Sequence, residues 1–125
     1  MGAAQDDAAR AVVSGGTRGV GLAVATRFAD LGGHVAVLGR SGDALATAAE
    51  ALRRAGAASV LAIPTDATDD NSVAAAFMQV GEIWPDVNVL VNAVGPAGSG
   101  RFEAIGDDVW HQAFSQGVMT SVHCI

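Results

Sequence analysis

The chain has 125 residues, of which 50% are hydrophobic and 16% charged, and its formal net charge is −6. This length and apolar content suffice for one globular domain with a buried core. The acidic balance argues against a nucleic-acid partner, because affinity for a phosphate backbone comes from basic surface. No apolar stretch approaches the roughly 20 residues of a membrane helix, and residues 1–7 lack the basic character of a signal peptide. We therefore expect a cytoplasmic protein without a membrane partner.

The cysteine and histidine content gives no sign of a metal site. Cys124 is the one cysteine, so no disulfide can form within the chain, and we expect this residue to serve in packing. His34, His111 and His123 lie far apart, with no carboxylate or second cysteine at ligand spacing. The sequence therefore predicts no bound metal.

Short apolar runs alternate with longer segments of helical periodicity along the whole chain. Strands are predicted at residues 11–13, 34–38, 60–63 and 87–91. A first helix is predicted from Gly19 to the glycines at 32–33, and a second from a cap at Ser41 or Asp43 to Gly56. A third is predicted from a cap at Asp69, Asp70 or Ser72 through Val80. The last is predicted from about Asp107 to Ile125, with Asp107 or Asp108 as its cap. In the first helix, the spacing predicts a buried stripe of Val20, Ala23, Val24, Phe28 and Leu31.

This alternation indicates right-handed βαβ units, and hence an α/β fold with a Rossmann-type, doubly wound parallel sheet. Four strands are visible, where a complete sheet of this type usually has more. The last helix has no glycine, asparagine or proline stop before Ile125. We therefore expect residues 1–125 to form a single domain that is incomplete at the C-terminus and truncated within its last helix.

The first strand and helix are joined by the sequence Ser14-Gly15-Gly16-Thr17-Arg18-Gly19-Val20-Gly21. Glycines here permit positive φ and remove Cβ atoms, so that a diphosphate can approach the backbone at a helix N-terminus. A glycine-rich turn can also arise simply because a strand and a helix pack closely. The spacing does not fit G-x-G-x-x-G, and a Walker loop needs a lysine, whereas all seven basic residues of this chain are arginines.

This loop resembles the T-G-x-x-x-G-x-G motif of the short-chain dehydrogenase/reductase family, with Ser14 in place of threonine. Asp66, after the third strand, is similar to the family's acid that accepts a hydrogen bond from the adenine amine, although it can also be read as a turn or cap residue. Asn92-Ala93-Val94-Gly95 resembles N-N-A-G, in which the first asparagine secures the sheet and the backbone lies along the ribose. Ala93 departs from that pattern. The likeness extends over essentially the whole chain.

Together these features predict a dinucleotide site. Its predicted members are Ser14, Gly15, Thr17, Arg18, Gly19, Val20, Gly21, Arg40, Ser41, Asp66, Ala67, Asn92, Ala93, Val94 and Gly95.

The end of the second strand bears on the choice of cofactor. An acid at this point usually binds the ribose 2′-hydroxyl of NAD, but here the chain has Gly39 and Arg40. A guanidinium can bind a 2′-phosphate, and Arg18 can approach the same group from the other side. We therefore expect NADP(H) to be preferred over NAD(H), the alternative being that both arginines are merely solvated.

The family's chemistry depends on a serine and on Tyr-x-x-x-Lys, and this chain has no tyrosine and no lysine. Trp110 resembles a tryptophan that the family often carries seven residues ahead of a catalytic asparagine, but the seventh residue here is Gly117. The resemblance thus implies the cofactor-binding half of an NADP(H)-dependent oxidoreductase, without catalytic residues and inactive alone. It would transfer hydride to a carbonyl or from an alcohol, and would meet a small-molecule substrate only together with a C-terminal half.

Two other functions are compatible with parts of the pattern. A dinucleotide-binding or partner-binding module complete at 125 residues would leave a strand edge and an apolar helix face unpaired. We therefore expect a homo-oligomer or self-association through the last helix. A different Rossmann-like enzyme, such as a methyltransferase, would need acids after the second strand and just before the glycines, and neither acid is present.

Overall fold

The computed structural model describes residues 8–95 and 101–125, and a parallel sheet of four strands lies at its centre. The strand order across this sheet is β3-β2-β1-β4, and every pairing is parallel. The strands are β1 (Arg10–Ser14), β2 (His34–Gly39), β3 (Ser59–Pro64) and β4 (Val89–Asn92). Each lies within a few residues of its predicted position.

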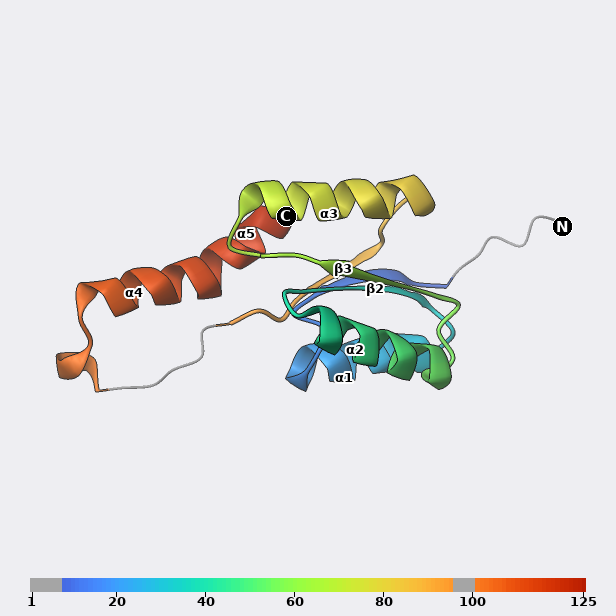
Figure 1. Ribbon diagram of the computed structural model, residues 1–125, viewed down its shortest axis with the longest axis horizontal. Coiled ribbons are helices and arrows are strands. Elements are labelled where there is room, and N and C mark those ends of the chain that lie inside the picture. The colour runs from blue at the N-terminus through green and yellow to red at the C-terminus, as the bar shows by residue number, and fades with distance from the viewer. Residues whose placement is uncertain (1–7, 96–100) are drawn as a thin grey trace, which may run out of the picture.

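Helices cover both faces of the sheet, which confirms the predicted doubly wound architecture (Figure 1). The longer helices are α1 (Gly19–Asp30), α2 (Gly42–Ala55) and α3 (Asp70–Ile83), followed by α4 (Asp107–Phe114) and α5 (Thr120–Cys124). In Figure 1, α1 and α2 lie below the sheet and α3 lies above it, while α4 extends away from the sheet. Among the described residues, no helix has both the length and the apolar character needed to cross a membrane.

Alternate residues of the central strands supply the two halves of the core. Val12 and Leu38 pack with Val80 and Trp84 on the side of α3, whereas Val13 and its neighbours face α1 and α2. Burying one such side chain contributes about 1.5 to 3 kcal/mol relative to leaving it exposed. The continuous apolar character of these strands therefore reflects a sheet that is covered on both faces.

The structure corrects the predicted buried face of α1. Val20 and Leu31 are 77% and 67% exposed, and the residues that α1 buries are Gly21, Ala25 and Ala29. The reason is the short distance between the start of α1 and the loop before it, because a Cβ atom added to Gly21 would lie only 2.0 Å from the carbonyl oxygen of Gly15. Where α1 lies closest to the sheet only small side chains fit, while the predicted Phe28 is half-buried and packs at the edge of the same cluster.

Most predicted helix ends are confirmed. The Ser41 hydroxyl caps α2 by accepting from Ala44 N at 3.3 Å, and α2 ends at Gly56. The Asp69 carboxylate caps α3 by accepting from Asn71 N at 3.0 Å. Neither acid predicted to cap the last helix does so, because the cap residue of α4 is Gly106, one position earlier.

The predicted helix from 107 to 125 is not one regular α-helix. A five-residue π-helical segment, η2 (Ser115–Met119), separates α4 from α5, and a short 3₁₀ turn, η1 (Phe102–Ala104), precedes α4. A π-helical turn contains an extra residue and so rotates the helix after it relative to the helix before it. Hydrophobic periodicity did not reveal this interruption.

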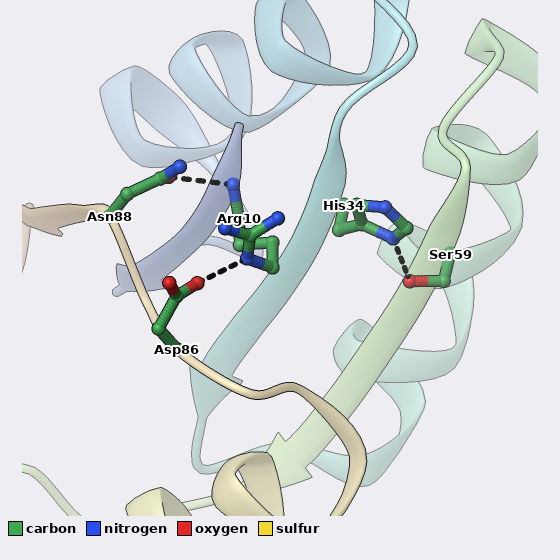
Figure 2. Close-up of polar contacts among 5 residues, drawn as sticks. All are labelled: Arg10, His34, Ser59, Asp86 and Asn88. Atoms are coloured by element: carbon green, nitrogen blue, oxygen red, sulfur yellow. Dashed lines mark hydrogen bonds and ion pairs between the residues drawn. The ribbon is translucent and has the colours of Figure 1, made fainter. Parts of the chain in front are cut away.

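Polar contacts at the amino ends of the strands hold the sheet together on the side opposite the carboxyl ends (Figure 2). Arg10 donates from its backbone N to Asn88 Oδ1 at 2.8 Å and from Nε to Asp86 Oδ1 at 2.5 Å. Next to them, His34 Nδ1 and Ser59 Oγ lie 2.7 Å apart, which joins the start of β2 to that of β3. These contacts fix where each strand begins relative to its neighbour.

The close approach at Gly21 predicts a large effect of a single methyl group. Gly21→Ala should lower the free energy of unfolding by about 3 kcal/mol or more, because the added Cβ would overlap backbone atoms of Gly15 that cannot move aside cheaply. Gly81→Ala is the matched control, since nothing lies within 4 Å of a Cβ at this exposed position of α3. This variant should gain up to about 1 kcal/mol from helix propensity. Urea unfolding measures both values, and equal stability of the two variants would contradict the packing argument.

Candidate functional site

A cavity of about 500 Å³ lies where the carboxyl ends of the four strands meet the start of α1. Its walls come from the glycine loop, from the segments that follow β2, β3 and β4, and from the last helical run. The lining residues are Ser14, Gly15, Thr17, Arg18, Gly19, Val20, Leu38, Gly39, Arg40, Thr65, Asp66, Ala67, Thr68, Ala93, Val94, Gly95, Gln112 and Gln116. The predicted site residues thus come together in one place, apart from three.

The three exceptions have other positions. Gly21 lies beneath the loop against Gly15, and the Ser41 hydroxyl is used to cap α2. Asn92 ends β4 opposite Ser14 in the sheet, and its side chain is exposed and does not line the cavity. Any role of these residues in binding stays a prediction.

The glycine loop is held tightly between its neighbours. Gly15 N donates to Leu38 O, and Ala93 N donates to Ser14 O, both at 2.9 Å. Gly15 has φ +79°, and a Cβ there would lie 2.9 Å from the carbonyl carbon of Ala93. Glycine is therefore required at this position both by its conformation and by the space available.

The N-terminus of α1 offers donors to this cavity. Arg18, the residue before the helix, is extended, and its guanidinium has no acceptor with which to cap a backbone N–H; the first turn contains no acid. The first N–H groups of any helix lack acceptors within the helix, and Gly19 and Val20 line the cavity. α2 and α3, by contrast, are capped by Ser41 and Asp69. The start of α1 consequently fits an anion such as a diphosphate.

Asp66 is oriented at the cavity wall by its neighbour Thr68. Asp66 Oδ1 accepts from Thr68 Oγ1 at 2.6 Å and from Thr68 N at 3.0 Å. The pKa of the Asp66 carboxyl lies below its usual value, mainly because of the hydrogen bond from the Thr68 hydroxyl and next because of the one from the Thr68 backbone N–H. Burial acts in the opposite direction, and the Arg40 guanidinium lowers the pKa further. Asp66 is thus ionised at neutral pH, and it forms a turn as well as lining the cavity. Within residues 8–95 and 101–125, no hydrogen bond occupies its second oxygen, Oδ2.

Positive charge lies at the end of β2. Arg40 and Arg18 are both exposed and both line the cavity, with Arg40 close enough to Asp66 to affect its carboxyl group. Gly39 precedes Arg40, and a Cβ there would lie 3.0 Å from Thr17 Cγ2. A larger residue at position 39 would therefore press on Thr17, which also lines the cavity.

Ser14 lines the cavity from its buried end, and the thiol of Cys124 lies next to the Ser14 side chain. The Ser14 hydroxyl is 1% exposed and, in the described part of the chain, makes no hydrogen bond of ordinary geometry. Burial raises the pKa of the Cys124 thiol, and the nearby Ser14 hydroxyl offsets part of that rise. Cys124 is thus a neutral, buried thiol at neutral pH, in keeping with the predicted packing role.

Sequence reasoning missed six of the lining residues in two different ways. Leu38, Gly39, Thr65 and Thr68 lie within two positions of predicted residues and could have been included as their neighbours. Gln112 and Gln116 come from the last helical run, where no sequence pattern indicated contact with the cavity.

Comparison with known proteins identifies relatives of this site. A family model described as short chain dehydrogenase matches residues 9–125. The 2-(R)-hydroxypropyl-CoM dehydrogenase of Xanthobacter autotrophicus is 38% identical over 89 residues, which cover 71% of this chain and 36% of that protein. The NADP-dependent (R)-specific alcohol dehydrogenase of Lentilactobacillus kefiri is 31% identical, over 84% of this chain and 41% of that protein.

Solved structures agree with the sequence relatives. The L-sorbose reductase of Gluconobacter frateurii, complexed with NADPH and L-sorbose, matches with a TM-score of 0.83 and 30% identity, over 91% of this chain and 43% of that chain. The chain thus spans well under half the length of these relatives. The family model covers nearly the whole chain and the motifs agree with it, so the protein belongs to the short-chain dehydrogenase family.

Proposed function

We propose that this chain binds NADP(H) and forms the cofactor-binding half of a short-chain oxidoreductase acting on a carbonyl or an alcohol. One observation carries the proposal: a single cavity brings together an uncapped helix N-terminus, the Asp66 carboxylate and the Arg40 guanidinium. These groups match the diphosphate, the adenine amine and a 2′-phosphate, respectively. Relatives named for NADP or complexed with NADPH support it.

Each part of the cavity has a proposed role in holding the dinucleotide. Backbone N–H groups of the glycine loop bind the diphosphate, and Asp66 Oδ2 accepts from the adenine amine. The backbone from Ala93 to Gly95 lies along a ribose. When bound, NADP(H) supplies hydride transfer at its nicotinamide ring, and the residues of this chain bind and orient it.

The preference for NADP(H) rests on charge at the end of β2. Arg40 can meet a 2′-phosphate with charge-assisted hydrogen bonds of about 1.5 to 3 kcal/mol each, or about ten- to hundredfold in affinity. Arg18 lines the same cavity and adds a second positive charge. An acid at this point would instead repel the phosphate.

The chemistry of proton transfer is proposed to come from outside these residues. The chain has no tyrosine and no lysine, so it has neither partner of a Tyr-x-x-x-Lys pair. Gly117 stands in the π-helical segment where the family's pattern has an asparagine, and it has no side chain to hold a water. We therefore infer that the chain binds the cofactor without turning over substrate.

We also infer self-association through the last helical run. Trp110, Phe114 and Val118 are each 45–56% exposed and, with Ala113, line an apolar depression of about 780 Å³. An apolar surface of this kind is typical of an interaction site. A second copy of the chain can present the same face and cover it.

The cofactor assignment predicts a loss of preference in Arg40→Asp. The wild-type chain should bind NADPH about ten- to hundredfold more tightly than NADH, and Arg40→Asp should abolish this difference through loss of attraction and added repulsion. Isothermal titration calorimetry on the full chain measures both affinities. Arg53→Asp, an equal charge change on α2 outside the cavity, should behave as wild type. An unchanged NADPH to NADH ratio in Arg40→Asp would refute the preference.

The absence of proton-transfer groups predicts a chain that binds but does not catalyse. Incubated with NADPH and a panel of aldehydes and ketones, the purified chain should consume NADPH no faster than buffer. The absorbance of NADPH measures this directly. A substrate-dependent rate that disappears in Arg40→Asp would show that the chain carries its own catalytic groups and would contradict the inference.

The exposed apolar face predicts a concentration-dependent assembly. Wild-type chain should sediment above the 12.5 kDa of a monomer, and Phe114→Asp should return it to monomer by placing a charge in the contact. Analytical ultracentrifugation resolves the two states. Met78→Asp is the control, because Met78 is 69% exposed on α3, away from this depression. Monomeric wild type at all concentrations would contradict self-association.

A further inference from the structure

Two carboxamide side chains line the dinucleotide cavity without a role in the binding scheme above. Gln112 on α4 and Gln116 in the π-helical segment face it from the last helical run. They lie on a wall that the glycine loop and the strand ends do not supply.

Both glutamines lie on one side of the last helical run because they are four residues apart. Gln112, Gln116, Thr120 and Cys124 recur every four residues, and in a regular α-helix each such step advances about 40° around the axis. The glutamines nevertheless line the cavity while Thr120 and Cys124 are 1% and 8% exposed. The extra residue of the π turn at η2 offsets the drift and keeps the row aligned.

The same run is fixed to the wall that contains Asp66. His123 Nδ1 donates to Ala67 O at 2.8 Å, and α5 packs against α3 and β4. Thr120 Oγ1 donates to Gln116 O at 2.7 Å, so the backbone that carries this glutamine is tied to the buried turn after it. The last helical run is therefore attached to the segment after β3 at Ala67, and it carries both glutamines that line the cavity.

The chemistry of a carboxamide selects the part of a ligand that it can bind. Each glutamine offers both a donor and an acceptor and carries no charge, which suits ribose hydroxyls and the edge of a purine. Phosphate oxygens only accept, and the glycine loop already supplies donors for them. Arg40 and Asp66, which follow β2 and β3, line the same cavity and are the residues assigned to the ribose phosphate and to adenine.

We propose that Gln116, together with Gln112, hydrogen-bonds the adenosine part of the bound dinucleotide and helps to select an adenine nucleotide. This inference rests on the proposed binding of NADP(H) and adds specificity residues to that site. The spacing of four residues places both side chains on the side of the run that lines the cavity.

The test replaces the carboxamides with groups of similar length that cannot form these hydrogen bonds. Gln116→Met and the double variant with Gln112→Met keep the side-chain length and a good helix propensity. Gln79→Met is the control, because Gln79 is exposed on α3 and does not line the cavity. The ligands are NADP⁺ and adenosine 2′,5′-bisphosphate, which contains the adenosine part alone.

Gln116→Met should weaken binding of both ligands by the same factor of about five- to tenfold, the value of about one hydrogen bond, and the double variant should weaken it further. The control should bind as wild type does, and the melting temperature without ligand should be the same for all variants. A shared loss of affinity at unchanged stability distinguishes direct contact from a structural role.

Each contrary result has a separate meaning. Wild-type chain that binds neither ligand would refute the proposed function and this inference with it. Wild-type binding that persists within twofold in the double variant would overturn the role of the glutamines and leave the proposed function standing. Weakened binding of NADP⁺ with unchanged binding of the bisphosphate would overturn the assignment to the adenosine part.

Discussion

The contact between Gly15 and Gly21 is the constraint on which the rest of the structure depends. With no Cβ atom on Gly21, α1 begins directly against the end of β1, and a methyl group would come within 2.0 Å of the Gly15 carbonyl oxygen. This closeness brings Ala25 and Ala29 onto the sheet and directs the uncapped N-terminus of α1 at the carboxyl ends of the strands. The position of the anion site and the packing of one face of the core thus follow from the same contact.

The cavity contains positive charge although the chain as a whole is negatively charged. The net charge of −6 would repel a polyanionic cofactor at long range, yet the cavity itself pairs backbone donors with Arg18 and Arg40. The carboxylate of Asp66, which also lines the cavity, accepts both hydrogen bonds from Thr68 through its Oδ1 atom. Local arrangement therefore matters more than net charge, because screening limits the long-range term to about 10 Å in ordinary salt.

The amino-acid pattern was sufficient for the architecture and for most of the site. Apolar runs and glycine spacing predicted the four strands and the loop, because strands of a parallel sheet that is buried on both faces consist of nearly continuous apolar residues. The prediction for the buried face of α1 was wrong at Val20 and Leu31, which are exposed, because the short distance at Gly21 selects small residues; the predicted Phe28 does pack against the core.

The π turn and the two glutamines could not be predicted for a different reason. Neither a five-residue change of helical pitch nor the approach of Gln112 and Gln116 to the strand ends has a local signal, because both depend on how α5 is fixed to Ala67 and α3. Sequence motifs identify residues, such as the loop glycines, whose type is required by an unusual backbone conformation or by close packing of the backbone. They do not identify side chains whose surroundings alone give them a part in a site.

The polar contacts of Arg10 with Asp86 and Asn88 lie at the opposite end of the strands from the cavity. This separation means that the residues which set strand register and those which would meet a ligand are subject to different demands. Substitutions of exposed cavity residues such as Arg18 and Arg40 leave these contacts untouched, whereas the glycines of the loop are fixed by backbone packing. An exposed cavity side chain can therefore be exchanged for another ligand preference without disturbing the contacts that align the strands at their amino ends.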